Sequence, residues 1–354
     1  MDQKLNVAVL FGGQSSEHEV SCMSVQTIIK ALKPEKYELI LIGITKEGRW
    51  LKAGSLEDIK NGTWYESKIK AVLSPDASDQ CVIADDGEKT EKIHIDVIFP
   101  VLHGMYGEDG TVQGLFELSK IPYVGCGVLS SSVAMDKVYT KILVEELGIR
   151  QADHVVISHI DMHDMESCIA KVEAKLDYPV FVKPSKAGSS CGVNKAVDKE
   201  TLKAALEEAV KHDIRILVEE MIVGREIECA VLGGYAPEAS DVGEVLSAED
   251  FYTYDAKYNN PVSRTELHPV FPEGVLEEIR RDAVAIFKKI DGYGLARVDF
   301  FLEKGTNEVI FNEINTLPGF TSISMYPMLW AEKGVDNAAL ADKLIELAFH
   351  RYER

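Results

Sequence analysis

Strand-like apolar runs and an amphipathic helix-like segment alternate at the start of the chain. Residues 5–11 (LNVAVLF) form a short apolar run that ends at two glycines, and residues 37–44 form a second one. Between them, over residues 19–32, apolar positions recur every three or four residues, which is typical of a helix with one buried face. Ser16 and Glu19 have the spacing of a capping box at its start. The β-α-β order predicts a parallel sheet with helices on its faces.

The rest of the chain continues the mixed pattern. Residues 47–93 are polar and turn-rich, which predicts peripheral strands and loops, and a buried strand is expected over 94–101. Because 354 residues exceed one small domain, we expect an α/β protein of three domains, 1–135, 136–223 and 224–354. The other predicted elements are helices at 137–147, 199–211 and 337–352 and strands at 154–158, 179–183 and 214–219.

Composition narrows the classes of function. Hydrophobic residues at 46% and charged residues at 27% are those of an ordinary globular protein. With no apolar run long enough to span a bilayer and no signal-peptide layout, we expect a cytoplasmic protein without a membrane partner. The six cysteines include no C-x-x-C pair, which favours free thiols. A net charge of −20 argues against nucleic-acid binding, so any phosphate site must be built locally from Lys, Arg and backbone N–H groups.

The most informative stretch is GLARVDFFLEKGTNEVIFNEINTLPGFTS, residues 294–322. Two strand-like runs flank a polar turn, which predicts a β-hairpin. Side chains alternate between the faces of a strand, so Arg297 and Asp299 share one face of the first run. By the same rule Glu313 and Asn315 share a face of the second run. Asp, Glu and Asn oxygens are then expected together on one surface.

The register of this hairpin and its chemistry follow from the turn. With the turn at 303–307, Arg297 is predicted to lie opposite Glu313, with Asp299 one diagonal away. Hard cations such as Mg²⁺ take oxygen ligands and commonly share them with substrate phosphates. A solvated polar face is the alternative. The rigid Asn-Thr-Leu-Pro-Gly continuation to Gly319 favours a functional site.

Two segments could bind a nucleotide. Lys183 ends a strand-like run, and the Gly/Ser-rich residues 188–192 after it can turn several N–H groups toward phosphate oxygens. A plain hairpin turn is the alternative, and the Walker A spacing is absent. Glu219 and Glu226, at strand ends, could accept hydrogen bonds from an adenine amino group and ribose hydroxyls. Taken alone, these two residues are better explained as a solvated pair of carboxylates.

Three further features lie in loops. Glu17 and His103 follow predicted parallel strands in glycine-flanked loops, and ligands collect at such strand ends. A structural hydrogen-bonding histidine is the alternative for His103. Residues 251–260 (FYTYDAKYNN) lack clean periodicity, and we expect either a lid that excludes water from reactants or a surface strand.

Taken together and in order, these motifs resemble the D-alanine–D-alanine ligase family of the ATP-grasp superfamily. The resemblance runs from Val7 to Leu347, with residues 47–93 outside its firm part. It implies three α/β domains: an N-terminal parallel-sheet domain and two ATP-grasp α+β domains. The motifs that carry it are FGGQSSEHEVS, HGMYGEDGTVQG, MDK, KPSKAGSSCGV, VEEMIVGRE, YDAKY, ARVDF and NEINTLPGFTSIS.

The resemblance implies an ATP-dependent ligase that joins two D-alanine molecules through a D-alanyl phosphate, for peptidoglycan precursor synthesis. It implies ATP as a substrate, two Mg²⁺ ions with Mn²⁺ as an alternative, and a homodimer. The ATP site would consist of Lys137, Lys183, Ser190, Glu219, Glu220, Ile222 and Glu226, and the metal ligands would be Asp299, Glu313 and Asn315.

The same resemblance assigns the catalytic residues. Glu17 would hold the amino group of the first D-alanine and form a hydrogen-bonded set with Ser189 and Tyr258. His103 would lie beside the first D-alanine and the acyl phosphate. Lys257 in the lid would neutralise phosphate charge. The second D-alanine and the oxyanion would be received by Arg297, Gly319 and Ser324.

Related activities remain as alternatives. A D-alanine–D-serine ligase is the main one, and Met325 stands where some D-serine ligases carry Arg, which favours D-alanine. The pair Lys257-Tyr258 matches family members that use an amine nucleophile, whereas ligases that form D-alanyl-D-lactate depart from it. A non-catalytic nucleotide sensor is expected to lose a phosphate-binding lysine or a metal ligand, and this chain keeps all of them. The last alternative is an ATP-grasp ligase for another acid and amine, and the motif around Glu17 and the lid residues argue against it.

Overall fold

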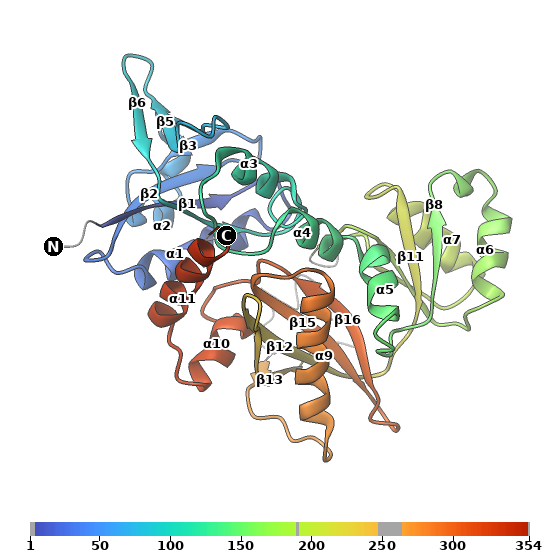
Figure 1. Ribbon diagram of the computed structural model, residues 1–354. Coiled ribbons are helices and arrows are strands. Elements are labelled where there is room, and N and C mark those ends of the chain that lie inside the picture. Colours follow the sequence, from blue (N-terminus) through green and yellow to red (C-terminus); the bar gives the residue numbers. More distant parts are fainter. Residues whose placement is uncertain (1–3, 189–190, 247–263, 353–354) are drawn as a thin grey trace.

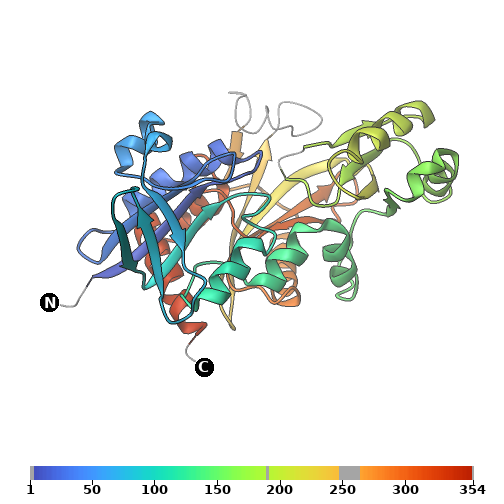
Figure 2. The same ribbon diagram turned by 90° about the horizontal axis from the view of Figure 1, so that it is seen from above.

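The computed structural model describes residues 4–188, 191–246 and 264–352. Three β-sheets follow one another along this part of the chain, with helices packed on them. Figures 1 and 2 show the N-terminal and central sheets at opposite ends of the molecule, with the C-terminal sheet between them. The expected α/β class is therefore confirmed, whereas the boundaries at residues 135 and 223 stay a prediction.

The N-terminal sheet has the order β6-β5-β4-β3-β2-β1-β7, with β1 parallel to both β2 and β7. Pro100 lies in β7, which is the edge strand, where a missing N–H donor is tolerated. Its strands are β1 Leu5–Gly12, β2 Tyr37–Ile44, β3 Trp50–Lys52, β4 Lys70–Leu73, β5 Cys81–Asp85, β6 Thr90–His94 and β7 Val97–Leu102.

Helices cover both faces of β1, which explains its unbroken apolar sequence. Val7 and Val9 face the core formed with helices α1 and α11, whereas Ala8 and Leu10 face the core formed with α3. The C-terminal helix thus returns to the N-terminal sheet. The helices of this region are α1 His18–Ala31, α2 Leu56–Asn61, the 3₁₀ turn η1 Trp64–Glu66, α3 Thr111–Ser119, α4 Val128–Met135 and α11 Asn337–His350.

Two local expectations were wrong. The helix start carries no capping box, because Glu17 occupies the N-cap position and makes no side-chain cap bond. Ser15 instead accepts a hydrogen bond from the Glu17 N–H and donates one to the carbonyl of His103. The last strand of this sheet begins at Val97, because residues 90–94 belong to the separate edge strand β6.

The central sheet, β10-β9-β11-β8, is antiparallel and covered on one face by helices α6 and α7. Val180 and Val182 of β9 point into that core. Phe181 and Lys183 alternate with them, so they point away from the helices. The elements are α5 Lys137–Glu145, β8 His154–Ser158, the 3₁₀ turn η2 Asp161–His163, α6 Met165–Glu173, β9 Val180–Pro184, β10 Asn194–Ala196, α7 Lys199–Ala209 and β11 Arg215–Glu220.

The C-terminal sheet, β14-β13-β12-β15-β16, packs one face on helix α9. Its opposite face carries the polar residues of the predicted hairpin. The elements are β12 Gly224–Gly233, β13 Glu238–Leu246, β14 Arg264–Glu266, α9 Val275–Lys289, β15 Gly294–Glu303, β16 Val309–Asn315 and α10 Met325–Glu332. No helix among the described residues is long and apolar enough to cross a membrane. All six cysteines are free thiols, as expected.

Candidate active site

The hairpin β15–β16 forms as predicted, but its register differs. Asp299 pairs with Glu313, and Arg297 pairs with Asn315 rather than with Glu313. Two local features shift the pairing. The Glu303 N–H donates to the carbonyl of Glu308, so the turn closes on residue 308 rather than on residue 307 as expected. A register shift after Asp299 then adds one residue to β16.

This shift is a β-bulge that decides which face Glu313 occupies. Beyond the bulge Phe300 pairs with Phe311, so Asn312 is the extra residue. Without it Glu313 would pair with Val298 on the apolar face that packs on α9. With it, Glu313 stands directly opposite Asp299 on the polar face.

A row of carboxylates therefore crosses three neighbouring strands. Glu228 of β12 pairs with Asp299 of β15, which pairs with Glu313 of β16. Glu228 was not predicted as a site residue, although its alternation with Glu226 places both on one face of the strand. The Asn315 side-chain amide donates to Asp299 Oδ2 at 3.0 Å, which draws the third predicted ligand into the same group.

Arg297 is the cation of this row. Its Nε and Nη2 donate to the two oxygens of Asp299 at 2.8 and 2.7 Å, and Nε lies 3.2 Å from Glu228 Oε2. The residue is 8% exposed. Burial works against its charge, but Asp299 and Glu228 outweigh this and hold the pKa of Arg297 well above its ordinary value.

Lys137 is held at the first position of α5 by the residue before it. The Asp136 carboxylate caps the helix by accepting from the Tyr139 N–H, takes a hydrogen bond from Ser185 Oγ at 2.5 Å, and pairs with Arg215. None of these supporting residues was singled out from the sequence, although Asp136 belongs to the MDK motif.

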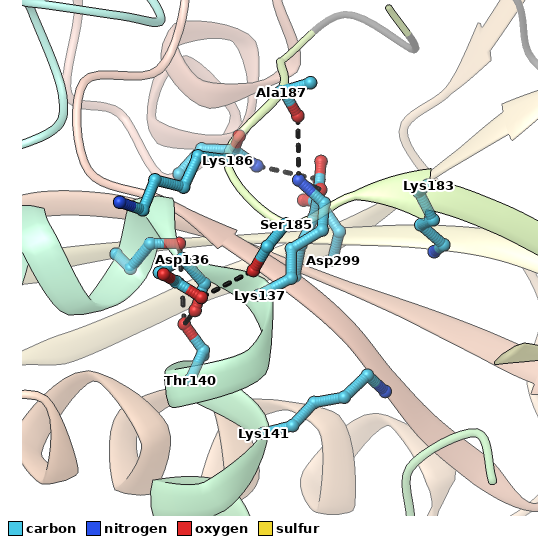
Figure 3. A network of polar contacts seen from close by, with 12 residues as sticks. Asp136, Lys137, Thr140, Lys141, Lys183, Ser185, Lys186, Ala187 and Asp299 are labelled. Atoms are coloured by element: carbon cyan, nitrogen blue, oxygen red, sulfur yellow. Dashed lines mark hydrogen bonds and ion pairs between the residues drawn. The ribbon is translucent and has the colours of Figure 1, made fainter. Parts of the chain in front are cut away.

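The ammonium group of Lys137 projects toward the segment after β9 (Figure 3). It donates to the Ala187 carbonyl at 3.0 Å and lies 3.3 Å from Glu313 Oε2. Lys137 thus connects the Gly/Ser-rich segment with the carboxylate row.

A second cationic group surrounds Glu219. This residue is 4% exposed and pairs with both Lys183 and Lys141, the latter at 2.6 Å. Burial alone would raise the pKa of Glu219, but the two lysines lower it to about 2. Burial also opposes the charge of Lys183, and Glu219 outweighs it, so the pKa of Lys183 is raised. Lys141 is a further member of this group that the sequence did not suggest.

These groups open onto one cleft of about 690 Å³ between the central and C-terminal sheets. It brings together nine of the predicted site residues. They are Lys137, Lys183, Glu219, Glu220, Ile222, Glu226, Arg297, Asp299 and Glu313. Phe181, Met221, Val245 and Phe300 add apolar walls. Such a mixture of apolar walls and a few convergent charges suits a nucleotide.

Glu17, another predicted residue, lies between a loop of the N-terminal sheet and a loop of the central sheet. Glu17 is 9% exposed, and a Cβ built on Gly104 or Gly188 would come within 2.6 or 2.7 Å of its Oε2. The carboxylate thus contacts both the loop after β7 and the Gly/Ser-rich segment after β9. That segment also links β9 to the antiparallel β10, so it is the hairpin connection that the sequence offered as the alternative, whereas its binding of phosphate stays a prediction.

Gly319 and Ser324 also come together. A Cβ on Gly319 would lie 2.8 Å from Ser324 Oγ, and Ser324 Oγ accepts from the Thr321 N–H at 3.0 Å. His103 lies nearby in the fold, with its Nδ1 2.8 Å from the Leu317 carbonyl. The turn that carries Gly319 therefore adjoins the N-terminal part of the chain.

The residues fit a divalent cation shared with phosphates. Among the described residues no group of three or more His, Cys, Asp and Glu side chains could hold a metal ion by itself. Asp299 and Glu313 nevertheless supply facing carboxylates, and Asn315 adds an amide oxygen. Mg²⁺ commonly takes one or two carboxylates and completes its shell with phosphate oxygens and water.

Four predicted residues lie outside the described residues: Ser189, Ser190, Lys257 and Tyr258. The expected lid at 251–260 lies there too. Met325, the residue weighed for acceptor choice, is 3% exposed in the core, and a Cβ on Gly243 would meet its sulfur at 2.2 Å. The side chain thus packs directly on the backbone of β13.

Comparison with known proteins gives the family. Residues 6–126 match the family described as D-ala D-ala ligase N-terminus, and residues 143–346 match D-ala D-ala ligase C-terminus. The chain belongs to the D-alanine–D-alanine ligase family. The resemblance inferred from the motifs is therefore confirmed.

Individual members of the family align over almost the whole chain. A D-alanine–D-alanine ligase of Ruminiclostridium cellulolyticum is 53% identical, covering 99% of this chain and 96% of that protein. One from Acetivibrio thermocellus is 50% identical over 99% of this chain and 98% of that protein.

Solved structures of the family share the fold. The VanG D-Ala:D-Ser ligase from Enterococcus faecalis is 38% identical with a TM-score of 0.89, covering 98% of this chain and 100% of that one. The D-alanine–D-alanine ligase from Coxiella burnetii is 35% identical with a TM-score of 0.86, covering 99% and 95%. The expected ATP-grasp ligase fold is confirmed by these likenesses.

Proposed function

We propose that this protein is an ATP-dependent D-alanine–D-alanine ligase that makes the dipeptide for peptidoglycan precursors. One observation carries the proposal beyond family membership. Gly188, in the segment that Lys137 contacts through Ala187, lies against the carboxylate of Glu17. This contact supports adjacent sites for phosphates and for a substrate ammonium group, as phosphorylation of an amino acid requires.

The first half-reaction activates a carboxylate. An amine cannot displace oxide from a carboxylate, so the γ-phosphoryl group of ATP is transferred to the first D-alanine to give an acyl phosphate. Phosphoryl transfer depends on positioning and charge neutralisation. Lys137 and Lys183 reach the cleft and supply positive charge, and Lys257 is assigned the same task.

Divalent cations complete this charge balance. We assign two Mg²⁺ ions, or Mn²⁺ in their place, to Asp299, Glu313 and Asn315. When bound, the ions would supply positive charge against the transferred phosphoryl group. The facing carboxylates that the bulge in β16 creates support this assignment.

In the second half-reaction the amine of the second D-alanine attacks the acyl carbon and phosphate leaves. Arg297 and the Gly319 N–H are assigned to the oxyanion that forms, and Ser324 to the second D-alanine. The closeness of Gly319 and Ser324 supports a shared task. Glu17, with Ser189 and Tyr258, is assigned to the ammonium group of the first D-alanine.

The nucleoside of ATP is assigned to the part of the same cleft that Glu219 and Glu226 line, beside Lys183. Glu219 and Glu226 would accept hydrogen bonds from adenine and ribose, Glu220 and Ile222 would contribute main-chain groups, and Ser190 would contact phosphate. The apolar walls of the cleft support a stacked base there.

A D-serine acceptor is the second candidate, because the VanG structural neighbour is a D-Ala:D-Ser ligase. Met325, packed on Gly243, offers no donor for a hydroxyl group at its position. An apolar pocket discriminates weakly against an added hydroxyl, so side activity with D-serine is expected.

Assembly and location complete the proposal. We also propose a homodimer, for which the exposed Leu118 of α3 and Leu129 of α4 are candidate interface residues. A cytoplasmic location follows from the use of ATP.

The decisive experiment measures ATP-dependent phosphate release and dipeptide formation with D-alanine, D-serine, D-lactate and L-alanine, singly and in pairs. D-Alanine alone should give stoichiometric phosphate and D-alanyl-D-alanine. Absence of dipeptide with D-alanine, or a higher yield of mixed product with D-serine, would contradict the proposal.

A further inference from the structure

Three side chains of the N-terminal part hold the turn that carries Gly319. Glu108 Oε1 accepts from the Leu317 N–H at 2.9 Å, and His103 Nδ1 lies 2.8 Å from the Leu317 carbonyl oxygen. Ser24 Oγ accepts from the Phe320 N–H at 3.2 Å. Residues 317–320 are thus fixed on both sides of Gly319 by groups more than 200 positions away in sequence.

The hydrogen-bond directions in this network are mutually consistent. The Leu317 carbonyl can only accept, so Nδ1 of His103 carries the proton. In the neutral form of the ring, Nε2 accepts from Ser24 Oγ, which is 3.1 Å away. The Ser24 hydroxyl therefore donates to His103 and accepts from Phe320. Both ring nitrogens of His103 are engaged within the protein.

The part of the network formed by Ser24, His103 and the turn is shielded from water. Ser24 is 0% and His103 is 5% exposed, and Leu317 and Phe320 are 5% and 4% exposed. Buried hydrogen bonds of this kind are costly to break, because the groups left behind find no solvent partner. The turn is consequently held more firmly than a surface loop of the same sequence would be.

Glu108 extends the network to the neighbourhood of the first substrate. Its second oxygen, Oε2, accepts from the Gly104 N–H at 2.8 Å, and Gly104 contacts Glu17. The charged groups that act on Glu108 are Glu17 and Arg297. Burial, followed by Glu17, raises the pKa of Glu108 to about 8. An ammonium group bound at Glu17 would favour the ionised form, which is the better acceptor for both N–H groups.

We propose that Ser24, His103 and Glu108 are positioning residues that set the Gly319 N–H for the oxyanion of the second half-reaction. The inference rests on the proposed function, in which Gly319 is that donor. It also gives His103 a different task from direct contact with the acyl phosphate. Donor placement matters steeply, since a misplacement of about 1 Å can cost about 100-fold in rate.

The proposal predicts which half-reaction fails. The tetrahedral oxyanion exists only while the second D-alanine attacks, so phosphoryl transfer to the first D-alanine should continue when the turn is displaced. The acyl phosphate then waits longer and is hydrolysed. The ratio of phosphate released to dipeptide formed should rise, whereas general destabilisation would lower both together.

The test compares Ser24→Ala with Ser21→Ala. Both serines lie on α1 with 0% exposure, but Ser21 bonds to Gly12 and Val101 rather than to the turn. Ser24→Ala should lower the kcat for dipeptide about 10- to 100-fold, with an unchanged KM for ATP and a raised phosphate-to-dipeptide ratio. Ser21→Ala should keep the wild-type ratio.

A second pair keeps the test decisive if Ser24→Ala does not fold. His103→Asn retains a donor near the Nδ1 position, and His103→Leu retains none. The phosphate-to-dipeptide ratio of His103→Asn should stay closer to that of the wild type than the ratio of His103→Leu. A wild-type ratio in the folded Ser24→Ala variant, or in His103→Leu, would overturn the proposal. Failure of the wild-type protein to make dipeptide would instead overturn the proposed function.

Discussion

Replacing Glu219 with Gln removes the counter-charge that Lys141 and Lys183 share. The substitution keeps the volume of the side chain but leaves two ammonium groups beside a neutral amide. Lys141 is 2% exposed, so water cannot compensate. Removing one partner of a buried ion pair typically costs about 3–5 kcal/mol. Glu219→Gln is therefore expected to lower the free energy of unfolding and to weaken ATP binding through Lys183.

The pKa of Glu219 gives a second route to the magnitude. A fall from the ordinary 4.5 to about 2 corresponds to about 3 kcal/mol of stability at pH 7, at about 1.4 kcal/mol per unit. Because the pKa is lower in the folded state, this stability is present above pH 4.5 and is lost as the pH falls through 2. By pH 3 about 1 kcal/mol should remain.

Urea unfolding of the wild type and Glu219→Gln at pH 7 and at pH 3 measures both quantities. Glu220→Gln is the matched control, because its carboxylate pairs with Arg150 at a site where both side chains are about one-third exposed. Such pairs contribute about 0–1 kcal/mol. A cost for Glu219→Gln no larger than that of the control, or one that does not shrink at low pH, would refute the reasoning.

Three further predictions concern the site. Glu313→Gln should abolish ligation while the protein stays folded, because the carboxylate opposite Asp299 is lost; near-normal phosphate release with D-alanine would contradict the metal assignment. Gly188→Ala should raise the KM for the first D-alanine, since its Cβ would lie 2.7 Å from Glu17 Oε2, whereas Gly114→Ala, with nothing within 4 Å, should leave it unchanged. Met325→Arg should shift product formation toward D-serine, and it should also lower the thermal midpoint because the side chain packs on Gly243. Met325→Leu should lower the free energy of unfolding by less than about 1.5 kcal/mol. An unchanged product ratio in Met325→Arg would place residue 325 outside the acceptor site.

Regular local patterns were readable from the sequence. Period-two alternation placed Arg297 with Asp299 and Glu313 with Asn315, and the structure keeps both pairs on the polar face. The helix of residues 19–32 appears at nearly its expected bounds. These features depend on neighbouring residues alone, which is why the sequence was sufficient for them.

The motifs carried more than local structure. Read in order, they indicated the ligase family, and the comparisons confirm it. They did not indicate how the supporting residues act, because Asp136 pairs with Ser185 and Arg215, Lys141 with Glu219, and Glu228 with Arg297, and these partners are distant in sequence.

Tertiary structure decided the rest. The added residue in β16 places Glu313 opposite Asp299, and the hydrophobic periodicity of the sequence does not predict such a bulge. The two lysines around Glu219 come from different elements, so their effect on its pKa appears only after folding. His103 likewise finds Leu317 across 214 positions. Neighbouring residues alone set which chemical groups are present and which of them share a face of a strand. Packing between distant segments set the distances, burial and charge of these groups and, through the bulge, the face of the sheet that Glu313 occupies, because those properties depend on contacts that form only in the folded chain.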